Sequence, residues 1–257
     1  MSLLEIAGLD VRFGGLTAVD GLDFAVDEGA LVALIGPNGA GKTTAFNVIT
    51  GVYAPSAGSV RFAGHEIGGS PPHRISAAGV ARTFQNIRLF RSLTVLENVR
   101  AAAIGAQRSP LGDVLRGPRW ARREAERTER ARHLLARLGL ERFAGARADS
   151  LPYGEQRRLE IARALATGPK LLLLDEPAAG MNPSEKEALR ELIARLRGEF
   201  GLTIVLIDHD VAFVMNLCER ITVLDHGEKI AEGAPQAVRA DPKVIEAYLG
   251  REVEAGA

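Results

Sequence analysis

The sequence contains little cysteine, and its apolar runs are short. A single cysteine, Cys218, rules out a disulfide within the chain and a metal cluster built from cysteines. We expect this residue to be a buried small side chain rather than a reactive thiol. The longest apolar runs, 171–174 and 204–207, are far below the ~20 residues that span a bilayer. Because no secretory signal pattern opens the sequence, a cytoplasmic protein is expected.

Neither sign of charge is in excess. Lys+Arg and Asp+Glu both number 32, so the formal net charge is zero. This balance argues against a strongly basic nucleic-acid binder and an acidic-tail protein, although a neutral total can still contain a local charged patch. Lysine is scarce, occurring only at Lys42, Lys170, Lys186, Lys229 and Lys243. Apolar residues make up 46% of the 257, which is enough for one large domain or a core with a smaller lobe.

Strand and helix signals divide the chain into three parts. Alternating or apolar segments with turn signals between them predict short strands near the start, at 3–9, 22–26, 31–35 and 59–62. Strand signals fade after residue 73, so a helical subdomain is expected over roughly 80–160. It would contain an amphipathic helix at 121–140 and a surface insertion at 105–125.

The last third predicts a parallel sheet, because buried apolar runs alternate with helices there. The expected elements are strands at 171–174 and 203–207, helices at 184–199 and 211–218, a hairpin of 221–224 with 228–232, one helix over 235–249, and a frayed tail at 251–257. The fold class is therefore α/β, with a mostly parallel sheet and an antiparallel β segment at the N-terminus.

A glycine-rich segment at 36–43 reads Gly-Pro-Asn-Gly-Ala-Gly-Lys-Thr. It follows a predicted strand and opens a predicted helix, which favours a phosphate-binding P-loop over a chance glycine-rich turn. The glycines let successive backbone N–H groups face a phosphate, and the helix N-terminus adds partial positive charge. Lys42 is expected to reach the β- and γ-phosphates, and the Thr43 hydroxyl to ligate Mg²⁺. The sequence thus predicts nucleotide binding.

A second element is the run Leu-Leu-Leu-Leu-Asp-Glu-Pro at 171–177. A buried strand that ends in Asp175 places a carboxylate near the Mg²⁺ of a bound nucleotide. The adjacent Glu176 projects to another side and is predicted to polarise the attacking water as a general base. Without the P-loop this pair would indicate only a solvated strand end.

A third element, Leu-Pro-Tyr-Gly-Glu-Gln at 151–156, precedes a helical segment at 157–167. In that segment Leu159, Ala162 and Leu165 share one face. A turn that feeds a helix N-terminus is a second potential phosphate site. Since one nucleotide does not need two such sites from one chain, we expect this loop to serve the nucleotide of a second subunit.

These elements, in this order, resemble the nucleotide-binding subunits of ATP-binding-cassette (ABC) transporters. The resemblance covers nearly the whole chain and adds Gln85, in Arg-Thr-Phe-Gln-Asn-Ile-Arg, and His209, in Ile-Asp-His-Asp. It implies a P-loop NTPase core that hydrolyses ATP and forms one ABC ATPase domain over 1–257. It also implies that Phe13 stacks on adenine from a loop. Gln85 would sense Mg²⁺ and link to a membrane partner, and His209 would contact the γ-phosphate and help to position the water.

The expected site residues fall into four groups. The catalytic residues are Lys42, Glu176 and His209. The nucleotide-binding residues are Phe13, Gly36, Pro37, Asn38, Gly39, Ala40, Gly41, Lys42, Thr43 and Thr44. The signature-loop residues, which would grip the partner's nucleotide, are Leu151, Pro152, Tyr153, Gly154, Glu155 and Gln156. The Mg²⁺ residues are Thr43, Gln85 and Asp175.

The chain departs from the family's usual Leu-Ser-Gly-Gly-Gln signature. Pro152 replaces the serine, so the serine's hydroxyl contact to the partner's γ-phosphate is missing, and Tyr153 replaces a glycine. Backbone N–H groups and the helix end can still bind phosphate. At 178–183, which corresponds to the D-loop of the dimer interface, Gly180-Met181-Asn182 stands where Leu-Asp is usual.

Three strings, at 81–90, 177–183 and 247–250, are similar to the ATP-binding subunits of branched-chain amino-acid importers, the LivG type. This resemblance implies two transmembrane permease subunits, a second cassette (the same or a related chain) in a head-to-tail dimer, and indirectly a periplasmic or extracellular substrate-binding protein. It implies a peripheral position on the cytoplasmic face of the inner (plasma) membrane and no nucleic-acid partner.

Other functions share much of this pattern. Related subunits serve urea, amides or other amino acids. A lipid or lipopolysaccharide exporter subunit is opposed by the string around Gln85. A soluble ABC ATPase acting on DNA or the ribosome is opposed by the absence of a long coiled coil or second cassette within 257 residues. Glu176 and His209 oppose a nucleotide binder that does not hydrolyse.

Overall fold

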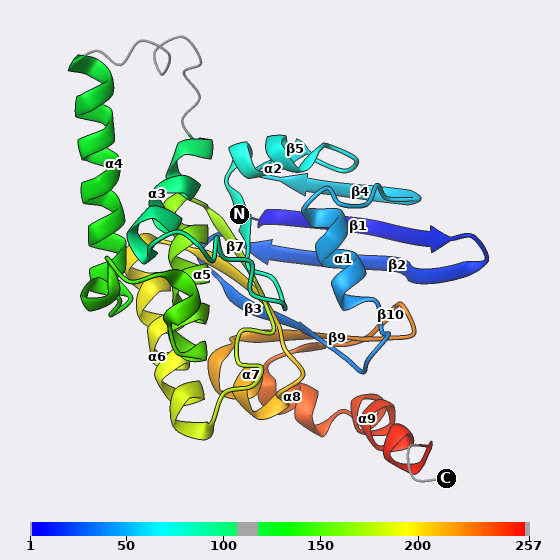
Figure 1. The fold of residues 1–257 in the computed structure, drawn as a ribbon. Coiled ribbons are helices and arrows are strands. Elements are labelled where there is room, and N and C mark those ends of the chain that lie inside the picture. Colours follow the sequence, from blue (N-terminus) through cyan, green and yellow to red (C-terminus); the bar gives the residue numbers. More distant parts are fainter. Residues whose placement is uncertain (1, 107–117, 255–257) are drawn as a thin grey trace. The chain divides into compact units, whose positions relative to one another are not determined.

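The computed structural model describes residues 2–106 and 118–254. The chain divides into two compact units, whose helices and strands are labelled in Figure 1. The core unit comprises Met1–Val80 and Lys170–Ala257, and the helical unit comprises Ala81–Pro169. Most of the predicted 105–125 insertion, residues 107–117, lies outside the described residues.

An antiparallel sheet forms the N-terminal part of the core unit, in the order β2-β1-β4-β5. Its strands are β1 (Ser2–Phe13), β2 (Leu16–Asp27), β4 (Ala57–Phe62) and β5 (His65–Glu66). The first two are longer than predicted, since β1 and β2 form one hairpin whose register runs from Phe13↔Leu16 to Ser2↔Asp27. The segment after β4 pairs briefly with it as β5.

The second sheet has the order β10-β9-β3-β8-β7-β6 and is mostly parallel, as predicted. Its strands are β3 (Leu31–Ile35), β6 (Val80–Arg82), β7 (Leu171–Asp175), β8 (Thr203–Ile207), β9 (Arg220–Asp225) and β10 (Glu228–Gly233). The central strands β3, β7 and β8 are buried along their whole length, which explains their continuous apolar sequences. The predicted hairpin of β9 and β10 is present and antiparallel.

The helices of the core unit are α1 (Lys42–Ile49), α2 (Pro72–Ala78), α6 (Pro183–Phe200), α7 (Val211–Leu217), α8 (Pro235–Ala240) and α9 (Pro242–Glu254). The prediction of one helix over 235–249 was wrong. Asp241 has an extended backbone (ψ 122°) because it precedes Pro242, and the chain forms two helices on either side of it. The prediction of a frayed tail at 251–257 was wrong for 251–254, which belong to α9, and residues 255–257 lie outside the described residues.

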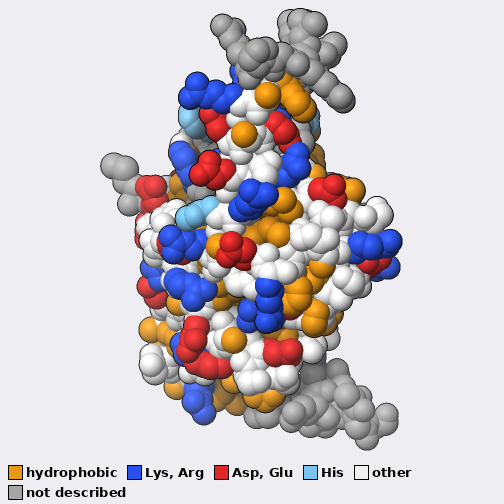
Figure 2. Space-filling view, turned by 60° about the vertical axis from the view of Figure 1, so that its left-hand side comes forward, with side chains coloured by type: hydrophobic (Ala, Val, Ile, Leu, Met, Phe, Trp, Pro, Cys, Tyr) orange, Lys and Arg blue, Asp and Glu red, His pale blue; other side chains and the backbone are white. Residues whose placement is uncertain are grey.

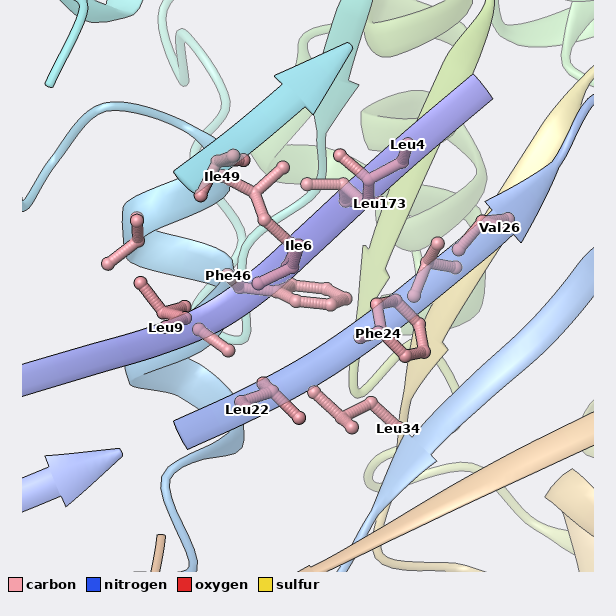
Figure 3. Close-up of a cluster of buried hydrophobic side chains, with 14 of the residues drawn as sticks. Leu4, Ile6, Leu9, Leu22, Phe24, Val26, Leu34, Phe46, Ile49 and Leu173 are labelled. Carbon is pink, nitrogen blue, oxygen red and sulfur yellow. The ribbon is translucent and has the colours of Figure 1, made fainter. Parts of the chain in front are cut away.

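Apolar side chains from both sheets and from α1 form the core of this unit (Figure 3). Alternate residues of β1 and β2 point inward, as the period of two along a strand requires. Phe46 and Ile49 of α1 meet them and are fully buried. Each such side chain contributes about 1.5–3 kcal/mol through burial, so this cluster anchors α1 to the sheets. The labelled members are Leu4, Ile6, Leu9, Leu22, Phe24, Val26, Leu34, Phe46, Ile49 and Leu173.

The helical unit is built from α3 (Val95–Ala106), α4 (Pro118–Arg137) and α5 (Tyr153–Ala166), with short 3₁₀ turns at Glu141–Phe143 and Ala148–Ser150. The predicted apolar faces are confirmed. Leu134, Leu135 and Leu138 are buried near the end of α4, and Leu159, Ala162 and Leu165 are buried on α5.

The surface is mixed in charge. On the face seen in Figure 2, positive and negative side chains of the described residues are interspersed rather than gathered by sign. Within the described part of the chain, no helix combines the length and apolarity needed to cross a membrane.

Candidate functional site

Three loops leave the parallel sheet of the core unit at the same edge. In the strand register, Leu206 of β8 lies between Ala33 of β3 and Leu174 of β7. Each of these strands ends one or two residues later, so the P-loop, the Asp175–Glu176 pair and the loop of His209 all begin there. The carboxyl edge of a parallel sheet is the usual place for a ligand site. The structure therefore brings these sequence-predicted elements to one location.

Two glycines give the P-loop its shape. Gly36 (φ 149°) and Gly41 (φ 99°) both have positive φ. A Cβ on Gly36 would lie 2.0 Å from the Leu224 carbonyl oxygen, and one on Gly41 would lie 2.4 Å from that of Ala18. No other residue fits at these two positions without moving backbone. Close contact with neighbouring strands thus fixes both ends of the loop.

Lys42 is buried and points back into the loop. Its Nζ donates to the carbonyl oxygens of Gly36 (2.7 Å) and Pro37 (2.8 Å). No side chain caps the N-terminus of α1, and its first turn contains no acidic residue. A cationic amine inside a loop that ends at an uncapped helix N-terminus is suited to bind phosphate. Of the remaining loop residues, Asn38, Gly39 and Thr43 are exposed, Thr44 is half-buried and Ala40 is buried.

Asp175 and Glu176 differ in environment although they are adjacent. Asp175 ends β7 and is 4% exposed. Glu176 has φ 47°, an unusual backbone conformation for a residue with a side chain. Its N–H donates to the Ile207 carbonyl oxygen at 2.7 Å, which ties the turn to the end of β8. Strained backbone of this kind is common where a side chain must be aimed.

His209 lies beside Glu176. Its Nδ1 is 3.6 Å from Glu176 Oε2 and 3.7 Å from Asp208 Oδ1. The imidazole is 61% exposed, and the Glu176 side chain is 21% exposed. One histidine therefore faces two carboxylates while most of its ring is open to a ligand or water.

Asp208 is a site residue that sequence reasoning missed. Its side chain is fully buried, and its carboxylate accepts hydrogen bonds from the backbone N–H groups of Ala178 (3.2 Å) and Asp210 (2.9 Å). Burial raises the pKa of Asp208, and these hydrogen bonds oppose the rise. The residue connects the segment after Glu176 with the loop of His209. Its position in Ile-Asp-His-Asp was the only available signal.

Capping residues fix the helices that follow these loops. Asn182 and Glu185 form a capping box at the start of α6. Asp210 caps α7 by accepting from the Phe213 N–H at 2.9 Å. Lys186 of α6 contacts Asp210 at 2.5 Å, and this hydrogen bond is the main reason that the pKa of Asp210 is lowered. The helix α6, which follows the segment at 178–183, is thus joined to the loop of His209 by a second contact.

Phe13 is exposed rather than part of the core. It is 45% exposed and meets Tyr53 edge to face, with ring centroids 5.1 Å apart and planes at 73°. The expectation that it lies in a loop was wrong, because β1 extends to Phe13. Two exposed rings in contact offer an apolar surface on which a flat base can stack. Tyr53 was not predicted from the sequence.

The helical unit contains Gln85 and the signature residues. The helix α5 begins at Tyr153, so four of the six signature residues form its first turn, and the expected start at 157 was wrong. Pro152 is the N-cap and supplies no capping side chain. Leu151 is buried, and its carbonyl oxygen accepts from Gln156 Nε2 at 2.8 Å. Gly154 and Glu155 are half-buried. Among the described residues, Gln85, Tyr153 and Gln156 are brought together around a cavity of about 540 Å³.

The sequence matches models of known protein families. A family model described as "ABC transporter" matches residues 19–179. The chain belongs to the ABC transporter family. A second model, "Branched-chain amino acid ATP-binding cassette transporter", matches residues 228–254 of the cassette, which include β10, α8 and α9. ABC cassettes are ATP-binding ATPases, so the P-loop described above is that of an ATPase.

Curated relatives match nearly the whole cassette. It is 48% identical over 249 residues to the high-affinity branched-chain amino acid transport ATP-binding protein BraF of Pseudomonas aeruginosa, with 96% of this chain and 98% of BraF covered. It is 46% identical to LivG of Escherichia coli K12 over the same shares. A probable LivG of Archaeoglobus fulgidus is 36% identical, with both chains fully covered.

Solved structures have the same fold. The ADP conformation of MJ1267, an ATP-binding cassette of an ABC transporter, is 34% identical with a TM-score of 0.86, covering 97% of this chain and 99% of that one. A dimeric post-hydrolysis state of the cassette MJ0796, bound to ADP and Pi, is 28% identical with a TM-score of 0.76, covering 90% and 98%. The α/β fold predicted from the sequence is therefore confirmed.

The donors in the core unit fit a magnesium ion bound together with a nucleotide. Thr43 offers a hydroxyl and Asp175 a carboxylate, both hard oxygen ligands. Among the described residues, no group of three or more His, Cys, Asp or Glu side chains could hold a metal. Mg²⁺ is commonly held by one or two protein ligands and completes its shell with phosphate oxygens and water, and Thr43 and Asp175 are donors of that kind.

Proposed function

We propose that the chain is the ATP-hydrolysing subunit of an importer for branched-chain amino acids. The observation that carries hydrolysis is the position of Glu176 and His209, 3.6 Å apart at the sheet edge where the P-loop begins. The substrate class rests on 46–48% identity, over nearly the full length, to the BraF and LivG transport proteins. The substrate itself does not touch this chain.

ATP binds through both ends of its structure. Phe13, next to Tyr53, stacks on the adenine, and the P-loop binds the phosphates. Lys42 moves from the carbonyl oxygens of Gly36 and Pro37 to the β- and γ-phosphates, exchanging neutral acceptors for charged ones. The contributing loop residues are those predicted, Gly36, Pro37, Asn38, Gly39, Ala40, Gly41, Lys42, Thr43 and Thr44.

Magnesium would be bound by Thr43 and Asp175, with Gln85 as a further ligand or sensor. The ion would supply charge neutralisation between the phosphate oxygens. Asp175 is suited to this role because its burial at the end of β7 fixes its carboxylate at the sheet edge.

Glu176 acts as the general base. Its carboxylate accepts a proton from the water that attacks the γ-phosphate, and His209 contacts that phosphate and orients the water. The strained backbone at Glu176 and its bond to Ile207 keep the carboxylate in place. Asp208 orients the loop of His209 through its hydrogen bond from the Asp210 N–H.

A second cassette completes the site. In a head-to-tail dimer, Leu151, Pro152, Tyr153, Gly154, Glu155 and Gln156 of one chain contact the nucleotide of the other, and 178–183 lie at the interface. The uncapped start of α5 provides N–H groups for that phosphate. The partner is a second copy or a related chain. Each chain forms one ABC ATPase domain, in which residues 80–160 are approximately the helical subdomain.

Two transmembrane permeases bind this pair at the cytoplasmic face of the inner membrane. The cavity beside Gln85 provides a docking surface, because it is lined by apolar and polar side chains of one unit. Its lining residues are Gln85, Asn86, Ile87, Leu89, Arg91, Ala148, Asp149, Tyr153 and Gln156. A substrate-binding protein outside the membrane delivers the amino acid to the permeases.

Affinity purification from gently solubilised membranes of the native host tests this function. We expect two multi-spanning permeases and a cassette to co-purify, together with a binding protein that binds leucine, isoleucine or valine. A binding protein specific for urea or an amide would redirect the substrate class. Recovery of ribosomes, DNA-repair proteins or an exporter subunit would overturn the importer assignment.

A further inference from the structure

A buried ion pair lies near the start of α5. The guanidinium Nη1 of Arg157 is 3.3 Å from Glu160 Oε2, and the two residues are only 3% and 5% exposed. Removing two charges from water is costly unless hydrogen bonds replace the lost hydration. The pair therefore requires an explanation beyond the ordinary stabilisation of a helix by charges three residues apart.

Most of the hydrogen bonds of this pair go to the backbone of one loop, residues 84–88, called here the Gln85 loop. Arg157 donates to the carbonyl oxygens of Phe84 (2.8 Å) and Gln85 (2.5 Å). Glu160 Oε1 accepts from the N–H groups of Phe84 (3.1 Å) and Arg88 (3.5 Å). This loop is neither helix nor strand. It is held by the guanidinium of Arg157 at its carbonyl oxygens and by the carboxylate of Glu160 at its N–H groups.

The same guanidinium also contacts the signature sequence. Tyr153 Oη accepts from Arg157 Nε at 3.2 Å and from Nη2 at 3.0 Å. The guanidinium carbon lies 5.5 Å from the centroid of the Tyr153 ring, which is 45% exposed. Tyr153 stands where the family's usual signature has a glycine, and a glycine has no hydroxyl to make these bonds. The tyrosine therefore connects the exposed start of α5 to the Gln85 loop through one arginine.

Burial makes this connection dependent on both partners. Desolvation raises the pKa of Glu160, whereas the N–H groups of Phe84 and Arg88 and the charge of Arg157 oppose the rise. Without Arg157, Glu160 would be a buried carboxylate with no cation, and it would compete poorly for the amides of the loop. A lysine could not replace the arginine, because two carbonyl oxygens and a hydroxyl need the planar fork of a guanidinium.

We propose that Arg157 and Glu160 are positioning residues that join the Gln85 loop to the signature helix, so that nucleotide contact at Tyr153 changes the conformation of the loop that faces the permease. This rests on the proposed function, in which the signature binds the partner's nucleotide and Gln85 senses Mg²⁺. Neither side chain touches the nucleotide. They act by transmitting a displacement between two segments more than 60 residues apart in the sequence.

Hydrogen exchange of backbone amides, followed by mass spectrometry on the full chain, tests the proposal. The background variant Glu176→Gln keeps ATP unhydrolysed while the cassettes close. We expect ATP with Mg²⁺ to slow exchange in the P-loop, at 151–157 and at 84–88 together. In Arg157→Met, the P-loop should still be protected, while the ATP-dependent protection of 84–88 falls about tenfold. Tyr153→Phe should give an intermediate loss, because it removes only the hydroxyl.

The control is Arg122→Met, an exposed arginine of α4 in the same unit, which should leave every protection pattern unchanged. Thermal melting of each variant identifies one that fails to fold, and Glu160→Gln then serves as the second variant, since it keeps the shape and removes the charge. Full ATP-dependent protection of 84–88 in folded Arg157→Met and Glu160→Gln would overturn the proposal.

The same experiment separates this inference from the function on which it rests. If ATP protects no segment, including the P-loop, the proposed ATPase function fails. The link between Arg157 and the Gln85 loop is then tested without nucleotide, where Arg157→Met should speed amide hydrogen exchange at 84–88 about tenfold. If ATP protects the P-loop and the variants behave as the parent does, the proposed ATPase function is supported and the link between Arg157 and the Gln85 loop is refuted.

Discussion

His209 Nδ1 lies 3.6 Å from Glu176 Oε2, and the two residues reach this position from different strands. Glu176 follows β7 and His209 follows β8, which are paired in register up to Asp175↔Ile207. The distance is just beyond a direct hydrogen bond, so a water or a phosphate oxygen can bridge or separate the two groups. The pairing of β7 with β8 therefore sets the distance between these two side chains.

The first prediction concerns Glu176→Gln. The amide keeps the size of the side chain but cannot accept the proton of the attacking water, so we expect hydrolysis to fall by about 10²–10⁴-fold. ATP affinity should be unchanged, because the P-loop is intact. Phosphate release and nucleotide titration measure the two effects separately. Hydrolysis at the parent rate would show that Glu176 is not the base.

The second prediction compares two glycines of the P-loop. Gly39→Ala places a Cβ in open space and adds only the cost of positive φ, about 1–2 kcal/mol. Gly36→Ala adds a clash with the Leu224 carbonyl oxygen and should cost about 1–3 kcal/mol more. The melting temperature of Gly36→Ala should therefore be well below that of Gly39→Ala. The affinity for ATP should follow the same order. Equal melting temperatures would contradict the close contact between Gly36 and the Leu224 carbonyl oxygen.

The third prediction concerns Asp208→Ala. It leaves the N–H groups of Ala178 and Asp210 without their buried acceptor, at about 1–3 kcal/mol each. We expect a lower melting temperature and a lower rate of hydrolysis, because the 178–183 segment and the His209 loop both lose their anchor. Asp208→Asn keeps one acceptor oxygen and should be milder. The exposed Asp20→Ala is a suitable control for stability.

Asp208 also gives stability a pH dependence. Its pKa is raised in the folded state, so the folded chain holds this proton at pH values where the unfolded chain has released it. Between the ordinary carboxyl pKa and the raised value, the contribution of Asp208 to the free energy of unfolding falls as pH rises. Asp208→Asn should remove this contribution. Denaturant titrations of both proteins across the acidic range measure it, and parallel pH profiles would refute it.

The fourth prediction concerns the only cysteine. Burial raises the pKa of the Cys218 thiol to about 12, and the residue is 5% exposed. Since the thiolate is the reactive form, the native chain should resist thiol reagents at neutral pH. In concentrated guanidinium the same reagent should label the single thiol fully. Rapid labelling of the native chain would contradict the buried position.

Much of the core site was predictable because its signals are local. The spacing of the glycines, Lys42 and Thr43 within a few residues defines the P-loop, and buried strands ending in Asp175 and before His209 place the other groups at one sheet edge. The break between α8 and α9 also had a local signal in Asp241-Pro242.

The missed residues depend on contacts that spacing does not encode. Asp208 acquires its role because Ala178, thirty residues earlier, brings its N–H to the carboxylate. Arg157 bonds to Phe84, 73 residues away, and its sequence neighbours suggest only a charged helix face. Tyr53 meets the Phe13 ring only through the tertiary fold, since the two residues are forty positions apart. Burial and tertiary approach, rather than composition, determine these three cases.

ATP-driven uptake of radiolabelled leucine into proteoliposomes tests whether this chain powers amino-acid import. They would contain the permeases and binding protein that co-purify with this chain, loaded with either the native cassette or Glu176→Gln. We predict uptake that requires ATP with Mg²⁺ and is lost with the variant. Leucine uptake that continues with Glu176→Gln, or ATP hydrolysis without uptake of leucine, isoleucine or valine, would contradict the account.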